Sequence, residues 1–372
     1  MRIYEVEIEK IISNGCGLGR VDGKAVFVPY TIPGEKVTLT VTEEKNNYLY
    51  GDVKDILLAS PFRVAPVCKY YFSCGGCTLG HADYKMQLDI RKNLIKEAIE
   101  RNGKITSPEI EVVEGAPYNY RCRAQFHRSQ ENKPGFKKRN SEEVVEIDSC
   151  HICNGGLNNF LRSSLLLEKE RLTVFAPDNN FYYDKKQKQN NIIEVKIKDK
   201  IIRTDVNCFF QSNIKMLEKS IDLIMQFLEG KIFFDFYSGV GIFGSFLAEQ
   251  AELIVSVESD KIAAALAREN IKSNKANFSS EKTEKFVIDW KGAIPDTVVL
   301  DPPRTGISAS VRKYLTDKKI KNIIYLSCDY ATLGRDLGFF TEKKYLIKKL
   351  FFLDFYPQTT HAESLAVLEF MG

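Results

Sequence analysis

The chain has 372 residues, 44% of them hydrophobic and 27% charged, which is long enough for two or three packed domains of ordinary globular composition. Its formal net charge of +4 is too small to indicate a nucleic-acid partner by itself. No run of about 18 uncharged apolar residues is present, so we expect no transmembrane helix and no membrane partner. The segment Met1–Glu7 contains no apolar signal sequence, and we therefore expect a cytoplasmic protein.

Short runs of alternating apolar and polar residues predict a small all-β barrel over residues 1–57. Gly-rich and Pro-Gly turns separate the runs, which cover residues 3–8, 25–28, 37–41 and 48–53. This spacing of short strands and turns is typical of a barrel, which we expect to be OB-like. Barrels of this kind often bind oligonucleotides, but the fold alone does not establish that function.

A cysteine-rich loop follows a Pro-bearing stretch, residues 59–66, that predicts a domain boundary. The loop has three thiols in a C-x5-C-x2-C spacing, those of Cys68, Cys74 and Cys77. Zinc and iron–sulfur clusters both accept four thiolates, and the spacing does not distinguish them. A fourth ligand must come from farther along the chain, where Cys150 and Cys153 are the candidates.

Residues 83–101 have the apolar spacing of a helix, and residues 107–205 predict a strand-rich region with a polar hairpin tip at 184–191. Within this region, residues 118–140 carry seven Arg or Lys residues against one acid, Glu131. A solvated charged loop is the ordinary explanation of such a run. Because aromatic residues and His127 interleave with the basic ones, a groove for single-stranded RNA is the alternative.

From about residue 213 onward, predicted helices and apolar strands alternate. Helices are expected at 213–228 and 261–274, and strands at 231–236, 253–257, 297–300 and 322–326. Near-continuous apolar strands in such an alternation predict a mostly parallel α/β sheet with both faces covered. In an open sheet of this class, ligands bind outside the carboxyl ends of the strands.

A glycine loop comes directly after one of these strands and opens a helix. Gly239 and Gly241 lie in the loop, and Asp235 precedes it. Glu258 ends the next strand, where a carboxylate can accept both hydrogen bonds from a ribose diol. The loop departs from the G-x-G-x-x-G spacing of dinucleotide sites, so S-adenosylmethionine is the preferred ligand and NAD the minor alternative.

Three reactive side chains fall next to predicted strands, namely Cys328, Asp301 and Glu363. Taken singly, they are explained as a small buried residue, a strand-end cap and a surface carboxylate. Because neighbouring strand ends meet at one edge of a sheet, their joint occurrence predicts a nucleophile, a ligand-binding acid and a general base in one site.

The order of these motifs resembles that of the RNA uracil-C5 methyltransferases. The matching segments are residues 68–77, 210–213, 235–241, 301–306, 327–333 and 357–363. The likeness covers almost the whole chain, and its cysteine and Pro-Gln-Thr segments are the specific part. The chain resembles the branch that has an N-terminal TRAM barrel and a [4Fe-4S] cluster and modifies 23S ribosomal RNA.

This resemblance implies a TRAM barrel at 1–57, a central iron–sulfur domain at 58–205 and a Rossmann-like methyltransferase domain at 206–372, with the helix 83–101 packed on the last. It implies that S-adenosylmethionine is held by Gln211, Asp235, Tyr237, Gly239, Gly241, Glu258 and Asp301. Asp301 would contact either the cofactor or the target uracil.

The resemblance also implies the chemistry. Cys328 would add to C6 of the target uracil, and Glu363 would remove the C5 proton. The cluster would be held by Cys68, Cys74, Cys77 and Cys150, because family members carry a single Cys at the position of Cys150; zinc is the less favoured occupant. RNA is the implied partner of a monomeric enzyme.

One departure and three rival interpretations remain open. Many family members have Asn-Pro after the nucleophile, where this chain has Asp329 and Tyr330, and we expect either a changed loop or an acid that raises the pKa of the thiol. The rivals are an amino-group methyltransferase that uses Asp-Pro-Pro, an RNA-binding or assembly factor without activity, and the same chemistry on transfer RNA.

Overall fold

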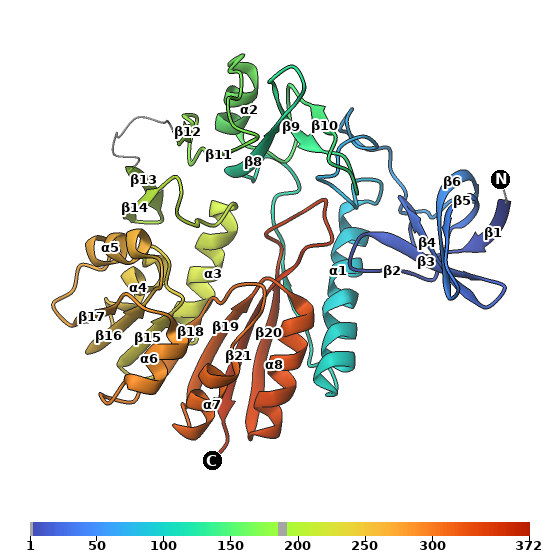
Figure 1. Ribbon diagram of the computed structural model, residues 1–372. Coiled ribbons are helices and arrows are strands. Elements are labelled where there is room, and N and C mark those ends of the chain that lie inside the picture. Colours follow the sequence, from blue (N-terminus) through green and yellow to red (C-terminus); the bar gives the residue numbers. More distant parts are fainter. Residues whose placement is uncertain (1–2, 185–191) are drawn as a thin grey trace.

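The computed structural model describes residues 3–184 and 192–372 of the chain (Figure 1). In these residues the strands form four sheets, of six, five, two and eight strands. Residues 185–191, most of the predicted hairpin tip, lie outside the described part. Every helix found in the described ranges is too short or too polar to cross a bilayer.

The N-terminal unit is all-β, as the alternating runs predict, and consists of a six-stranded sheet with the order β1-β5-β6-β4-β3-β2. Its strands are β1 (Ile3–Glu7), β2 (Lys10–Ile11), β3 (Cys16–Val21), β4 (Lys24–Pro29), β5 (Lys36–Glu44) and β6 (Tyr48–Leu58). A Cβ atom at Gly19 would collide with the carbonyl oxygen of Glu7. Glycine at this position therefore lets β3 approach the end of β1, so the sheet curls over its own core.

A long helix follows the cysteine loop and packs against the C-terminal domain. It consists of α1 (Tyr84–Ala98) and a final π-helical turn, η1 (Ile99–Gly103), in agreement with the predicted helix at 83–101. Asp83 caps its start by accepting the N–H of Met86 at 2.8 Å. A Cβ atom at Gly334 would collide with the carbonyl oxygen of Ala98, so this glycine permits the close packing of α1 on α8 (Tyr330–Glu342).

The central region has its own small core under a five-stranded sheet of order β10-β9-β8-β11-β12. The strands are β8 (Arg123–Arg128), β9 (Pro134–Lys137), β10 (Val144–Glu146), β11 (Arg171–Phe175) and β12 (Tyr182–Tyr183), and the associated helix is α2 (Gly155–Arg162). Phe126, Leu157 and Phe160 are fully buried in this core. The basic run 118–140 therefore lies largely on β8, β9 and the segments next to them.

The C-terminal domain is built on an eight-stranded sheet of order β17-β16-β15-β18-β19-β21-β20-β7. Its strands are β15 (Ile232–Phe236), β16 (Leu253–Val257), β17 (Ala276–Ser279), β18 (Thr297–Leu300), β19 (Asn322–Ser327), β20 (Tyr345–Leu353), β21 (Glu363–Phe370) and β7 (Glu111–Val113). The five strands from β17 to β19 are parallel, as predicted. β21 is antiparallel to both β19 and β20, because a loop rather than a crossover helix joins β20 to β21.

Helices cover both faces of this sheet, as the apolar strands predict (Figure 1). They are α3 (Ile214–Gln226), α4 (Ile242–Leu247), α5 (Lys261–Asn270), α6 (Thr283–Asp289), α7 (Ala309–Asp317) and α8. One buried cluster joins α3, α4 and α5 to the sheet, and the other joins α1, α6, α7 and α8.

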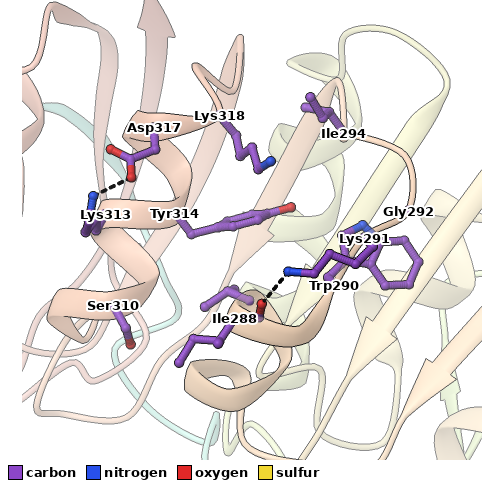
Figure 2. A pocket seen from close by; sticks show the side chains of 11 residues that line it. Ile288, Trp290, Lys291, Gly292, Ile294, Ser310, Lys313, Tyr314, Asp317 and Lys318 are labelled. Atoms are coloured by element: carbon purple, nitrogen blue, oxygen red, sulfur yellow. Dashed lines mark hydrogen bonds and ion pairs between the residues drawn. The ribbon is translucent and has the colours of Figure 1, made fainter.

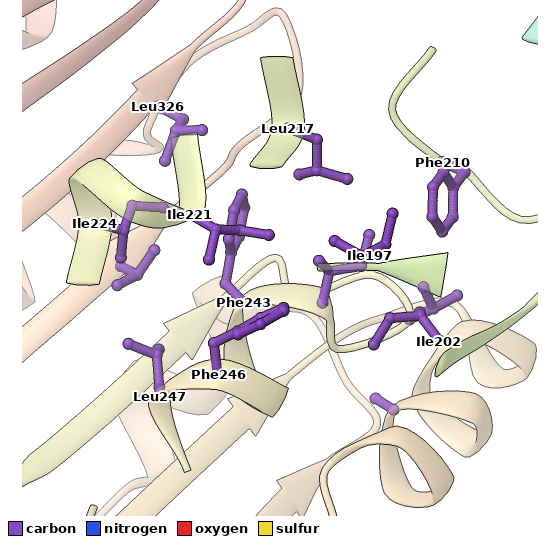
Figure 3. Packing of buried hydrophobic residues seen from close by; sticks show 14 of the residues in the cluster. Ile197, Ile202, Phe210, Leu217, Ile221, Ile224, Phe243, Phe246, Leu247 and Leu326 are labelled. Atoms are coloured by element: carbon purple, nitrogen blue, oxygen red, sulfur yellow. The ribbon is translucent and has the colours of Figure 1, made fainter. Parts of the chain in front are cut away.

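Two pieces of the predicted central domain belong to the C-terminal core instead. β7 pairs with β20 at the edge of the large sheet. The hairpin of β13 (Ile192–Ile197) and β14 (Lys200–Asp205) buries Ile197 and Ile202 in the same cluster as Phe243 and Phe246 of α4 (Figure 3). The boundary at residue 205 thus separates segments that share one core.

Candidate active site

A cavity of about 1190 Å³ lies at the carboxyl ends of β15, β16, β18 and β19, between the large sheet and strands β8 and β9. Seven of the predicted site residues line it: Gln211, Tyr237, Gly239, Glu258, Asp301, Cys328 and Glu363. Side chains that are far apart in sequence therefore meet at the sheet edge where an open α/β sheet binds ligands.

A second cavity of about 430 Å³ lies between α6 and α7, away from these residues (Figure 2). Trp290 and Tyr314 line it, and the ammonium group of Lys313 pairs with Asp317 at its rim, 2.5 Å apart. It contains none of the predicted site residues and is not part of the candidate active site.

Cys328 is a half-buried thiol that follows β19 directly. The pKa of this thiol is raised to about 12, chiefly by burial and then by the carboxyl groups of Glu363 and Asp301, while the charge of Arg304 opposes the rise. The expected acid beside the thiol is thus not Asp329. The Asp329 carboxylate caps α8 by accepting the N–H of Thr332 at 2.8 Å, which is the local consequence of the departure after the nucleophile.

Asp301 and Glu363 form an acidic pair beside the thiol, in which Glu363 is buried and Asp301 half-buried. Burial raises the pKa of both carboxyl groups, and the charge of Asp301 raises that of Glu363 further. Gln211 donates its amide N–H to Asp301 Oδ2 at 3.3 Å. Among the described residues, Gln211 Oε1 and Glu363 Oε1 are buried without a hydrogen-bond partner. Buried acceptors are nearly always satisfied, so these two atoms point to donors supplied by a ligand.

Asp235 and Gly241 were predicted to bind the cofactor, but they do not line the cavity. They support the glycine loop from the side that faces away from the cavity. Asp235 Oδ2 accepts the N–H of Gly244 at 2.8 Å, and burial raises the pKa of Asp235 to about 8. Gly241 has a φ of +79°, and a Cβ atom there would lie 2.9 Å from the Cβ of Ala267. Only glycine combines this left-handed conformation with such close helix packing.

Gly239 and Glu258 form the part of the loop that faces the cavity. The N–H of Gly239 donates to Glu258 Oε2 at 2.9 Å, and the N–H of Asp260 donates to Glu258 Oε1 at 2.7 Å. Each carboxylate oxygen keeps acceptor capacity for a further donor. A Cβ atom at Gly239 would meet no atom within 4 Å, so open space lies next to this backbone. The neighbouring Tyr237 has a φ of +60° and donates its hydroxyl to Glu284 at 3.3 Å.

Several cavity residues were not predicted as site residues, and three of them have side chains suited to binding or catalysis. Arg304 lies in the same Asp-Pro-Pro-Arg run as Asp301, and its charge lowers the pKa of Cys328. Phe209 comes two residues before Gln211 and is 65% exposed. Arg121 lines the cavity from the basic run. In the sequence, each of these residues lies in or next to a recognised motif or run. That position alone does not show which residues of the segment face the ligand.

The four predicted cluster ligands, Cys68, Cys74, Cys77 and Cys150, influence one another electrostatically. The charge of Cys150 raises the pKa of Cys68, Cys74 and Cys77, after the larger effect of burial. A hydrogen bond from Cys153 lowers the pKa of Cys150 itself, to about 6. Cys150 is thus the thiol whose charge acts on all three cysteines of the loop.

A single metal ion does not fit this arrangement. Within the described ranges, no group of three His, Cys, Asp or Glu side chains is placed to hold one ion. The placement of the described side chains therefore supports neither the predicted iron–sulfur cluster nor zinc.

Family models match two parts of the chain. Residues 2–54 match the TRAM domain, and residues 179–370 match the tRNA (uracil-5-)-methyltransferase family. An uncharacterized RNA methyltransferase of Treponema denticola is 33% identical, with 96% of each chain covered. One of Aquifex aeolicus is 31% identical, with 98% of each chain covered.

The fold is also that of a solved structure. The Pyrococcus abyssi tRNA (uracil-54, C5)-methyltransferase, in complex with S-adenosyl-L-homocysteine, aligns with a TM-score of 0.75 at 22% identity. The alignment covers 98% of this chain and 100% of that one. From the family models and the relatives, the chain belongs to the tRNA (uracil-5-)-methyltransferase family and is an RNA methyltransferase with an N-terminal TRAM domain.

Proposed function

We propose that the protein uses S-adenosylmethionine to methylate C5 of a specific uridine in 23S ribosomal RNA, through a covalent bond between Cys328 and C6 of the base. The observation that carries the proposal is the meeting of Cys328, Asp301 and Glu363 in one cavity with the glycine loop. An amino-group methyltransferase has no use for a thiol and a second buried carboxyl group in this place.

The residues that face the cavity fit S-adenosylmethionine. Glu258 has acceptor capacity for a ribose diol, and Gly239 leaves open space for close approach of a ligand to the backbone. The unsatisfied Oε1 of Gln211 is an acceptor for the amino group of the cofactor's methionine portion. When bound, S-adenosylmethionine supplies the methyl group. Asp235 and Gly241 act indirectly, by holding the loop in shape.

Cys328 acts first in the reaction. Its thiolate adds to C6 of the uracil, and the electrons of the C5–C6 double bond pass to the C4 carbonyl, which makes C5 nucleophilic. Burial disfavours the thiolate, and Arg304 is the nearby charge that favours it. After C5 has taken up the methyl group, Glu363 removes the C5 proton. The C6–S bond then breaks, which restores the double bond and frees Cys328.

The RNA is proposed to lie across the cavity mouth. Arg123, His127 and Lys137 line the cavity from β8 and β9, and Arg123 and Lys137 supply positive charge for the RNA backbone. Phe209 offers an exposed aromatic ring for stacking of a base. The half-buried position of Cys328 requires the target base to leave its stack before it can react. The TRAM sheet would hold the flanking nucleotides.

Cys68, Cys74, Cys77 and Cys150 are proposed to hold a [4Fe-4S] cluster with a structural role. The electrostatic interactions among these four thiols support this set. Of the four, Cys153 interacts only with Cys77 and Cys150. Four thiolates match the ligand requirement of such a cluster. Free thiols of this kind persist in a reducing cytoplasm.

Transfer RNA is the second candidate substrate. The matching family model and the Pyrococcus abyssi structure are both described as tRNA methyltransferases. The experiment that separates the candidates is incubation of the purified protein and S-adenosylmethionine with ribosomal or transfer RNA from a strain that lacks the gene. We expect 5-methyluridine at one position of 23S ribosomal RNA, and none with the Cys328→Ala variant. Methylation of transfer RNA alone selects the second candidate, and methylation of an amino group contradicts the proposed chemistry.

A further inference from the structure

The loop between β20 and β21, residues 354–362, forms one wall of the active-site cavity. Tyr356, Thr359 and His361 line the cavity from this loop, and Glu363 follows as the first residue of β21. The residues between them face other parts of the chain. The loop rises above the sheet beside the upper end of α1 in Figure 1. Its shape therefore depends on what holds its outer side.

Gln358 is the centre of the contacts on that outer side. Its backbone N–H donates to Gln87 Oε1 at 2.9 Å, and its side-chain Oε1 accepts from Gln87 Nε2 at 3.1 Å. Its carbonyl oxygen accepts the N–H groups of both Thr78 and Leu79 at 2.9 Å. Gln87 belongs to α1, and Thr78 follows the last cysteine of the cysteine loop. One buried residue thus connects the catalytic loop to two distant segments.

The backbone conformation of Gln358 shows that these contacts determine its position. Its φ is +71°, in the left-handed region that is strained for a residue with a side chain. Such a conformation persists only where the surroundings impose it. Gln358 is 4% exposed, so the imposed geometry is also shielded from water.

Two further contacts hold the same loop at its ends. Thr360 donates its hydroxyl to the carbonyl oxygen of Ser13 in the N-terminal unit at 2.7 Å, and its N–H donates to Thr78 Oγ1 at 3.1 Å. Asp354 pairs with the fully buried Arg91 of α1. The N-terminal unit, the cysteine loop and α1 therefore all contact the loop that precedes Glu363.

We propose that Gln358 is a positioning residue that acts with Gln87 to hold the catalytic loop, and that the cysteine loop and α1 influence the reaction through this contact. The inference rests on the proposed function, because it assigns the step that is affected. Cys328 is placed by β19 and does not depend on Gln358. Loss of the contact should therefore slow removal of the C5 proton more than formation of the bond to C6.

The test uses the full-length protein as isolated, with the Gln87→Ala variant. Gln87 does not line the cavity, and its removal leaves Gln358 without its amide partner. We measure steady-state turnover, KM for S-adenosylmethionine, and the fraction of protein linked covalently to RNA after denaturation. We expect kcat to fall about tenfold, as for a small misplacement of a catalytic group, while the linked fraction rises and KM for the cofactor stays unchanged.

Two more variants separate positioning from general loss of structure. Gln87→Glu keeps the acceptor for the N–H of Gln358 and should recover part of the turnover. Gln250→Ala removes an exposed glutamine far from the loop and should behave like the unchanged protein. A fall of turnover and of the linked fraction in parallel would overturn the inference, because partial unfolding lowers both.

The result also distinguishes failure of the inference from failure of the proposed function. Suppose that the unchanged protein methylates uridine, and that the fraction of protein linked to RNA is the same for Gln87→Ala as for the unchanged protein. The positioning role is then wrong, and the proposed function stands. If the unchanged protein forms neither 5-methyluridine nor a covalent complex, the proposed function is wrong, and the inference falls with it.

Discussion

The two walls of the active-site cavity are built in different ways. Asp301 and Cys328 follow β18 and β19, two neighbouring buried strands whose parallel register places both ends at the same edge. The loop 354–362 forms the other wall and is held by side chains and backbone groups from residues 13, 78, 87 and 91, while Glu363 itself begins β21 beside Cys328 at the end of β19. The strand ends are thus positioned by regular sheet geometry, and the loop that precedes the base by contacts across the whole chain.

This contrast teaches which parts of the site tolerate change. A strand in the middle of a sheet is held by hydrogen bonds to two neighbours, so few single substitutions displace its end. A loop held by a small number of long-range contacts moves when one contact is lost. Substitutions in the two walls should therefore have different effects.

The largest effect is expected from Glu363→Gln, which removes the base without changing its size. Loss of a general base costs about 10²–10⁴-fold in rate, so turnover should become very slow. Addition of Cys328 to C6 does not need this base, so the covalent protein–RNA complex should accumulate. Denaturing electrophoresis with labelled RNA measures the complex. Rapid release of methylated RNA by this variant would show that another group removes the proton.

Arg91→Ala should have the next largest effect, on stability rather than on chemistry. Arg91 and Asp354 are both fully buried, and removal of one partner of a buried ion pair leaves an uncompensated charge that costs about 3–5 kcal/mol. Tyr84 still donates its hydroxyl to Asp354 at 2.6 Å, so we expect the lower end of that range. Urea unfolding measures the change.

The matched control for Arg91 is Asn93→Ala, an exposed residue on the same helix, whose free energy of unfolding should be unchanged. Equal effects of the two substitutions would show that the contact between α1 and the loop contributes nothing to stability.

The smallest effect concerns the pKa of Cys328, which charged groups of the cavity shift in opposite directions. Glu363→Gln removes a charge that raises this pKa, and Arg304→Gln removes one that lowers it. Because alkylation requires the thiolate, iodoacetamide at pH 8 should modify Cys328 faster in the first variant and slower in the second. For an exposed arginine the change should be about threefold or less.

Mass spectrometry of the peptide that contains Cys328 distinguishes this thiol from the other eight cysteines. In all variants the rate should rise with pH, because the pKa of about 12 lies above the working range. The exposed Lys343→Gln serves as the control. An unchanged rate in both active-site variants would mean that burial alone sets the pKa.

The meeting of Asp301, Cys328 and Glu363 could be predicted from the sequence, but the contacts that hold the loop before Glu363 could not. The strands 253–257 and 297–300 begin and end at the predicted residues, because continuous apolar runs flanked by turns specify buried strands. Their order then places Asp301 beside Cys328. The contacts of Gln358 have no local pattern, since its amide pairs with that of Gln87, 271 positions away in the sequence.

Local motifs also fail to show which side of a loop faces the ligand. Asp235 and Gly241 belong to the recognised glycine loop, yet both lie behind it. Arg304 was part of a recognised motif without an assigned role, although it faces the cavity. The edge strand β7 is too short for periodicity to identify, and only pairing with β20 makes it a strand.

The most direct test of the account is the intact mass of the protein after incubation with S-adenosylmethionine and an RNA that contains the target uridine, under denaturing conditions. We expect a species with the mass of protein plus methylated RNA in the Glu363→Gln variant, with the bond located at Cys328 and lost when Cys328→Ala is added. A covalent species that survives Cys328→Ala, or full turnover by the Cys328→Ala protein, would contradict the claim that this thiol is the nucleophile.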